Sequence, residues 1–307
     1  MFSIILTILG LTLFEVVNSI DNAVINAEVL TKMSPRGRRW FLVWGILIAV
    51  FLVRGLLPWL ILLVTTGLGP IESLRSAIHS TPAALAAIQE AKPVLLIGAG
   101  VFLILLFVHW LFREEKTFGL LGEEFIQRHG IWFYAVASIF LLLIIWGATS
   151  FDDPRMVLAA VIGSTVFFIT HGFKENAEAM EERMIRGDES LSDMAKIFYL
   201  EAIDAVFSID GVLGAFAFTL SIPLILIGNG IGAIVVRQLT IGNISLVKRL
   251  PFLKNGAMYS ILALGLIMVA ESFGRHVPIW LSPIITFAII GYFLWLSIRN
   301  LKQNKTA

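Results

Sequence analysis

The sequence predicts an all-α polytopic membrane protein, a bundle of about nine transmembrane helices. Of its 307 residues, 58% are hydrophobic and only 15% are charged, whereas a soluble domain of this length needs more charge to cover its surface. Apolar runs of roughly 18–25 residues recur along the chain, which is the length an α-helix needs to cross a bilayer. The alternation typical of a β-barrel is absent from the sequence, so the predicted class is helical.

Each predicted span is a long apolar run, and the first and sixth are long with polar residues in the middle. The segment 67–92 contains TTGLGP, STP and AKP around short amphipathic pieces, so we expect a surface excursion there. The first run lacks a basic start and a small-residue cleavage site, so we expect a retained helix. The nine predicted spans are residues 2–30, 40–66, 93–112, 131–149, 157–174, 196–219, 222–244, 255–273 and 279–298.

Lysine and arginine residues predict the orientation of these spans, because cytoplasmic loops carry an excess of them. Seventeen of the 23 lie in loops on one side of the predicted bundle, four lie on the other side, and Arg54 and Arg237 fall inside spans. We therefore expect the N-terminus outside and the C-terminus in the cytoplasm. The charged segment 174–196 is then a cytoplasmic, helical connector, whose mixed charges are typical of a solvated surface.

The polar stretch of the first span has a counterpart in the sixth. EVVNSIDNAV begins at Glu15 and DAVFSIDGVL begins at Asp204, and both fit [E/D]-x-V-x-S-I-D-[N/G]. The following span of each half carries an arginine, Arg54 in FLVRGLL and Arg237 in IVVRQLT. The two copies run through the predicted membrane in opposite directions, as in transporters with inverted repeats. Chance similarity between apolar helices is the alternative.

Four spans, one linker span and four further spans account for the predicted nine. The chain then divides into a first transmembrane repeat (1–150), a linker span with its cytoplasmic connector (151–195) and a second, inverted repeat (196–307). This division places Asp21 and Asp210 near the middle of their spans.

Carboxylates at mid-membrane predict an ion site. Each ionised carboxylate there costs at least ~2.5–3.5 kcal/mol, so it must be protonated, paired with a base such as Arg54 or Arg237, or bound to a cation. Carboxylate, amide, hydroxyl and carbonyl oxygens suit hard divalent cations such as Mn²⁺, Mg²⁺ or Ca²⁺. The acidic side chains inside the two polar spans are Glu15, Asp21, Glu201, Asp204 and Asp210.

Helical geometry gathers most of these groups on two stripes. One stripe contains Glu15, Asn18, Ser19, Asn22 and Asn26, and the other contains Glu201, Asp204, Ser208 and Gly211. Asp21 and Asp210 lie off these stripes in a regular helix. Either they face another helix, or the S-I-D-[N/G] segment is unwound and turns them toward the stripe. The amides and hydroxyls have a structural alternative, hydrogen bonding between helices.

Several chemistries are excluded or disfavoured. The chain has no cysteine, which excludes disulfides, thiolate metal sites and thiol catalysis. A net charge of +1 gives no sign of a nucleic-acid partner. His109 and His171 lie near the predicted cytoplasmic ends of their spans, where we expect interfacial or hydrogen-bonded roles and not metal ligation.

The segments EVVNSIDNAV and EAIDAVFSIDGV resemble the TerC (tellurium-resistance protein C) family of integral membrane proteins, in a branch of unknown function. The resemblance covers most of the chain as a multi-span layout with paired acidic motifs. It implies location in the bacterial inner membrane and a role in metal homeostasis, with manganese efflux as the expected activity. Gly211 stands where relatives often have Ser, and the segments 67–92 and 174–196 are unlike the family, which leaves the ion identity open. The metal-binding positions carried over are Glu15, Asp21, Asn22, Asp204 and Asp210.

The predicted function is a secondary exporter of a divalent cation, with Mn²⁺ as substrate, no permanently bound cofactor and a proton or sodium counter-ion. Its other partner is the lipid bilayer. One alternative is a membrane metal-binding scaffold or stress-response protein without transport. Another is an intramembrane aspartyl protease, but the sequence lacks a Gly-x-Gly-Asp segment, so we expect no enzymatic activity. The supporting site residues are Asn18, Ser19, Arg54, Glu201, Ser208 and Arg237.

Overall fold

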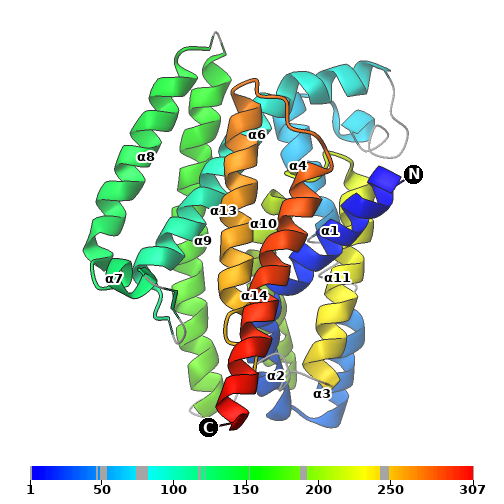
Figure 1. Cartoon of the computed structure of the whole chain (residues 1–307). Helices are drawn as coiled ribbons and strands as arrows, with labels where there is room; N and C mark the ends of the chain where they lie inside the picture. Colours follow the sequence, from blue (N-terminus) through cyan, green and yellow to red (C-terminus); the bar gives the residue numbers. More distant parts are fainter. Residues whose placement is uncertain are drawn as a thin grey trace.

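The structure is a computed structural model that describes residues 2–45, 48, 54–73, 82–116, 119–120, 122–151, 153–186, 192–242 and 249–306. Every regular element in these ranges is a helix, and they contain no strand. Figure 1 shows the long helices side by side in an elongated bundle, with α8 and α9 along one flank. The predicted all-helical class is therefore confirmed.

The helices of the described chain occur in the following order. In order they are α1 (Phe2–Asn18), α2 (Ile20–Thr31), α3 (Pro35–Trp40), the π-helix η1 (Phe41–Gly45), α4 (Arg54–Thr66), α6 (Pro82–Arg113), α7 (Glu123–Gln127), the 3₁₀-helix η3 (Gly130–Trp132), α8 (Phe133–Ala148), α9 (Pro154–Arg186), α10 (Asp193–Ala215), α11 (Ile222–Gly242), α13 (Leu253–Ser272) and α14 (Leu281–Thr306).

Six helical segments of the described chain are long and apolar enough to cross a membrane. They coincide with six of the nine predicted spans, so the chain is a multi-pass helical membrane protein. The other three predicted spans, 2–30, 40–66 and 196–219, contain α1, α4 and α10. Helices α1 and α4 are apolar but short, and α10 carries several acidic residues, so their crossing of the membrane stays a prediction. The six segments are Ala86–Arg113, Gly130–Ala148, Pro154–Lys174, Ile222–Thr240, Leu253–Ser272 and Leu281–Gln303.

Helix α6 forms the centre of the bundle, and α8 lies at its edge. In the most apolar stretch of α6, 78% of the residues are buried. In the most apolar stretch of Gly130–Ala148, which includes α8, only 22% are buried. Glycine allows α6 to approach α9 closely, because a Cβ on Gly163 would lie 2.1 Å from the carbonyl oxygen of Gly98. Leu142, Leu143 and Trp146 of α8 are exposed, as expected of side chains that face lipid.

Serine residues determine where α3 and α10 begin. The Ser34 side chain accepts a hydrogen bond from the Gly37 N–H at 3.2 Å, and Pro35 occupies the first helical position. Ser192 caps α10 in the same way. Such caps satisfy free N–H groups of the first turn. The Asp193 carboxylate accepts hydrogen bonds from the Ser34 N–H and hydroxyl, so the starts of the two helices are joined.

The two S-I-D-[N/G] motifs differ in backbone geometry. The helix bends at Ser19, whose φ of −92° and ψ of 2° separate α1 from α2. The hydrogen-bond ladder continues through this bend, because the Ser19 N–H still donates to the Glu15 carbonyl at 3.0 Å. Helix α10 runs without interruption through Ser208 and Asp210. The unwinding explanation is therefore wrong for the second motif.

One connecting segment is more helical than the sequence predicts, and the other is helical as predicted. Helix α6 begins at Pro82, so the last part of the expected surface excursion is continuous with the following span. Helix α9 continues to Arg186, which confirms the helical prediction for the first part of the 174–196 connector. On this helix the Lys174 side chain is only 11% exposed, whereas the neighbouring Phe173 is 62% exposed.

Candidate functional site

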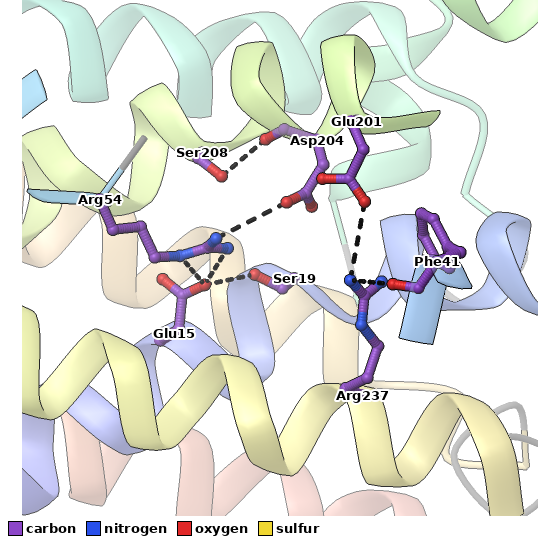
Figure 2. A network of polar contacts seen from close by, with 8 residues as sticks. All are labelled: Glu15, Ser19, Phe41, Arg54, Glu201, Asp204, Ser208 and Arg237. Carbon is purple, nitrogen blue, oxygen red and sulfur yellow. Dashed lines mark hydrogen bonds and ion pairs between the residues drawn. The ribbon is translucent and has the colours of Figure 1, made fainter. Parts of the chain in front are cut away.

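A buried arginine joins the two acidic motifs. Arg54, at the start of α4, donates to Glu15 Oε1 on α1 from Nη2 at 2.6 Å and from Nε at 2.9 Å. Its Nη1 lies 3.6 Å from Asp204 Oδ2 on α10. Glu15 is 1% exposed and Arg54 is 3% exposed. Figure 2 shows the guanidinium between the two carboxylates, so acids at matching positions of the two motifs share one cation.

Glycines on two neighbouring helices make room for Glu15. A Cβ on Gly211 of α10 would lie 2.8 Å from Glu15 Oε2, and one on Gly232 of α11 would lie 2.6 Å from Glu15 Cβ. Ser19 donates from its hydroxyl to Glu15 Oε1 at 2.9 Å. The carboxylate is therefore enclosed by helix backbone and held by an arginine and a serine. A larger residue at either glycine would displace it.

A second arginine extends the network toward η1. Arg237 Nη2 on α11 lies 3.8 Å from Glu201 Oε1 on α10 and donates to the Phe41 carbonyl at 3.3 Å. Its guanidinium also covers the Phe41 ring, 4.1 Å from the centroid, in a cation–π contact. Gly45 of η1 faces this pair, since an added Cβ would lie 2.0 Å from Glu201 Oε1. Both arginines point toward the acidic face of α10 (Figure 2).

Asp210 belongs to a separate ion pair. Lys174 of α9 donates to Asp210 Oδ2 at 2.5 Å, and the two side chains are only 11% and 7% exposed. The orientation count included Lys174 among the seventeen loop cations, but the structure places it within α9, with its side chain directed toward α10. Asp210 faces another helix, which is the first of the two explanations for its position off the acidic stripe.

The predicted site residues occupy different parts of this arrangement. Asn18 lies on the same side of α1 as Glu15, facing Gly211 of α10. A Cβ on Gly211 would lie 3.7 Å from Asn18 Nδ2. Ser208 donates its hydroxyl to the Asp204 backbone carbonyl at 2.6 Å, which is a contact within α10. The side chains of two predicted ligands lie outside the described residues, so their roles stay predictions; they are Asp21 and Asn22.

Several buried oxygens have unused hydrogen-bonding capacity. Asn26 Oδ1, Glu201 Oε1 and Asp210 Oδ1 have no hydrogen-bond partner among the described residues. Such oxygens are ligands of the type that hard divalent cations prefer. Within the same ranges, however, no group of three or more His, Cys, Asp or Glu residues is gathered closely enough to hold a metal ion. In this arrangement, arginine and lysine side chains neutralise Glu15, Asp204 and Asp210.

Two hollows border α10, one beyond its C-terminal end and one along its middle. A cavity of about 290 Å³ is lined by residues that follow α10 and by parts of α4, α6, α13 and α14, and it includes Phe218. The Phe218 and Phe14 rings are 5.8 Å apart, so the cavity wall contacts the residue that precedes Glu15 on α1. A groove of about 340 Å³ runs between α9 and α10 and includes Lys174 and Tyr199.

Sequence reasoning missed Lys174, Gly232 and Gly45. A signal for Lys174 exists, because it follows His171 by three residues and therefore shares its helix face if the helix continues. Gly232 lies in the glycine-rich IGNGIGA segment, which is typical of close helix packing but does not show that the packed group is a carboxylate. Gly45 has no comparable signal.

These features define a polytopic helical membrane protein with a buried network of ion pairs. The chain belongs to the family described as Protein of unknown function (DUF475), whose model matches residues 20–304. This range includes Arg54, Lys174, Arg237 and the acids of α10, but not Glu15. Neither the curated proteins nor the solved structures contain a significant match to this chain.

Proposed function

We propose that the protein is a secondary transporter that exports a divalent metal cation, with Mn²⁺ as substrate, across the bacterial inner membrane. The observation that carries the proposal is the position of the charged network. Acids of α1 and α10 are buried around Arg54, with a cavity beyond the C-terminal end of α10 and a groove along the middle of α10, beside Asp204. Ionisable groups inside membrane helices are costly and mark ion pathways. The resemblance of both acidic motifs to the TerC family supports the choice of cation and membrane.

The proposed architecture has nine spans in a 4+1+4 inverted repeat, with the N-terminus outside. Two contacts support it: Arg54 joins the matching acids Glu15 and Asp204, and α6 packs on α13, the third span of the other half. In Figure 1, α2, α3 and the C-terminus lie toward one end of the bundle, and the α8–α9 and α13–α14 connections lie toward the other. The basic residues of α3 therefore share an end with those of the α14 tail, as expected of a cytoplasmic face.

Arg54 and Lys174 act as internal counter-cations in the proposed cycle. They form ion pairs with Glu15, Asp204 and Asp210, which offsets part of the cost of burying these acids. A substrate cation that reaches the acids must take the place of the guanidinium or the ammonium. Because these bases lie on α4 and α9, binding requires those helices to shift relative to α10.

Two hollows provide the proposed access routes. The groove between α9 and α10 leads to Lys174 from the end that we propose to be cytoplasmic. The cavity beyond the Phe14–Phe218 pair leads outward. Opening one route while the other is closed gives alternating access, as in other inverted-repeat transporters. A proton or sodium ion moving inward supplies the energy.

The test is Mn²⁺ flux into proteoliposomes, followed by quenching of an enclosed fluorescent divalent-cation indicator. We expect flux with the wild type, and its loss in Asp204→Asn and Asp210→Asn, because each variant removes a carboxylate charge from the pathway. Glu90→Gln is the matched control, since its exposed side chain pairs with Arg155 at the surface. In cells, Asp21→Asn and Asp210→Asn are expected to abolish manganese tolerance at normal protein levels.

Different outcomes separate the candidate functions. Wild-type flux in both Asp204→Asn and Asp210→Asn would contradict the proposed ion site. Mn²⁺ binding without flux in the wild type would favour the alternative of a metal-binding protein that does not transport. A protease gains no support from the geometry, because Asp204 and Asp210 have different basic partners.

A further inference from the structure

A buried asparagine on α11 has no hydrogen-bond partner among the described residues. Asn229 is 0% exposed, and neither its Oδ1 nor its Nδ2 makes a hydrogen bond within those ranges. A buried amide without partners destabilises a folded protein, and most buried polar side chains have at least one partner. Neither the packing of α11 nor the contacts around Arg54 explain why this position is not occupied by an apolar residue.

The buried face of α11 leads from the cavity beyond the end of α10 to the charged network. Ile222 lines that cavity, and Ile225 is part of the apolar core. Gly232 lies against Glu15, because an added Cβ there would be 2.6 Å from Glu15 Cβ. Asn229 shares this helix face and lies between Ile225 and Gly232. It is therefore about one helical turn from the place where Glu15 packs on α11, on the side toward the cavity.

The opposite face of α11 carries side chains that are expected to face lipid. Ile227 and Ile234 on that face are exposed. Asn229 lies about half a turn around the helix from them and is completely buried, so its side chain points into the bundle. Helix α11 packs on α1 and α4, the two helices that the Glu15–Arg54 pair joins.

We propose that Asn229 Oδ1 is a ligand of the transported cation, which it binds together with the Glu15 carboxylate after Arg54 has moved away. This role rests on the proposed function. Amide oxygens are among the ligands that hard divalent cations prefer. Within the described ranges, no three acidic or histidine side chains gather closely enough to hold a metal ion, so a cation at Glu15 needs neutral oxygens as well. Asn229 has the only polar side chain of α11 between Ile222 and Val236.

An amide without a partner suits a site that must bind and release an ion. A hydrogen bond to a neighbouring helix would have to break whenever the cation bound, whereas an unpartnered oxygen is available as soon as the cation arrives. In this structure Arg54 occupies the Glu15 carboxylate, and the amide is left with unused hydrogen-bonding capacity. Local destabilisation of this kind is typical of positions that function requires. On export, the ion would leave the acids past Asn229 toward the cavity.

The test compares Mn²⁺ binding and stability in Asn229→Leu, whose side chain has nearly the same shape without the amide. Calorimetric titration of the purified full-length protein with MnCl₂ should show binding about tenfold weaker than in the wild type. The midpoint of unfolding by SDS should stay the same or rise, because the variant removes an unpartnered buried amide. Asn255→Leu is the matched control, since Asn255 is also buried but donates to Glu123 Oε2 at 2.9 Å. This control should unfold at lower SDS and bind Mn²⁺ as the wild type does.

The outcomes separate a ligand from a structural residue. Unchanged Mn²⁺ affinity in Asn229→Leu overturns the ligand role, and so does weaker binding together with a lower SDS midpoint, which a lost structural contact would produce. If Asn229→Leu does not fold, Asn229→Asp decides: the added carboxylate should tighten Mn²⁺ binding, and unchanged or weaker binding overturns the proposal. Wild-type protein that binds no Mn²⁺ overturns the proposed function and the ligand role together, whereas wild-type binding that Asn229→Leu leaves intact overturns the ligand role alone.

Discussion

Replacing Arg54 by methionine tests how strongly its ion pairs hold the bundle together. At an effective dielectric constant of about 20, the 2.6 Å separation from Glu15 corresponds to about 6 kcal/mol and the 3.6 Å separation from Asp204 to about 5 kcal/mol. The net loss is smaller, because Glu15 can take up a proton. Neutralising a glutamate at pH 7 from its ordinary pKa near 4.3 costs about 4 kcal/mol. We therefore expect Arg54→Met to lower the free energy of unfolding by about 3–5 kcal/mol.

The assay is unfolding by SDS in mixed micelles, followed by tryptophan fluorescence. Lys92→Met is the control, because the Lys92–Glu271 pair at 3.3 Å is 35% and 14% exposed and should contribute only about 0–1 kcal/mol. The double variant Arg54→Met/Glu15→Gln should recover part of the loss, since it removes an uncompensated carboxylate. Equal destabilisation by Arg54→Met and Lys92→Met would refute the reasoning.

Two further perturbations act on packing and on pH dependence. Gly211→Ala places a Cβ 2.8 Å from Glu15 Oε2, so we expect it to lower the free energy of unfolding by about 1–3 kcal/mol in the same assay. The control is Gly291→Ala, which should have little effect because no atom lies within 4 Å of the added Cβ. Hydrogen bonds from Ser34 hold the pKa of Asp193 below its usual value, so this carboxylate stabilises the fold above about pH 4 and loses that effect as the pH falls through the lowered pKa. Thermal unfolding measured from about pH 2 to 7 should show this loss in the wild type but not in Asp193→Asn, and identical acid dependence would contradict the assignment.

The apolar helices were predictable from composition because lipid imposes a simple requirement on them. A helix that faces hydrocarbon is apolar around most of its circumference, and α8 meets this requirement with its exposed leucines and Trp146. Helices α1 and α10 do not follow it, since their acids are compensated by bases such as Arg54 that come from other helices. Hydropathy along one segment contains no information about such partners.

The position of Asp210 shows where the sequence stops being informative about the site. Helical periodicity correctly placed Asp210 off the stripe that contains Glu201 and Asp204, because α10 is regular. It left two explanations open, and only the packing of α9 decides between them. In the structure, Lys174, the last residue of the predicted span 157–174, reaches the Asp210 carboxylate from α9.

The two arginines of the proposed repeat have unequal partners, which is relevant to the proposed transport cycle. Arg54 contacts an acid from each half of the chain, whereas Arg237 contacts Glu201 and the Phe41 carbonyl. A strictly symmetric bundle would give both arginines equivalent contacts, but alternating access requires each single state of an inverted repeat to be asymmetric. We expect the opposite state of the proposed cycle to exchange these roles, so that Arg237 binds Asp204 as Arg54 releases it. Asp204 is already placed for that exchange, because its carboxylate acts electrostatically on both guanidinium groups.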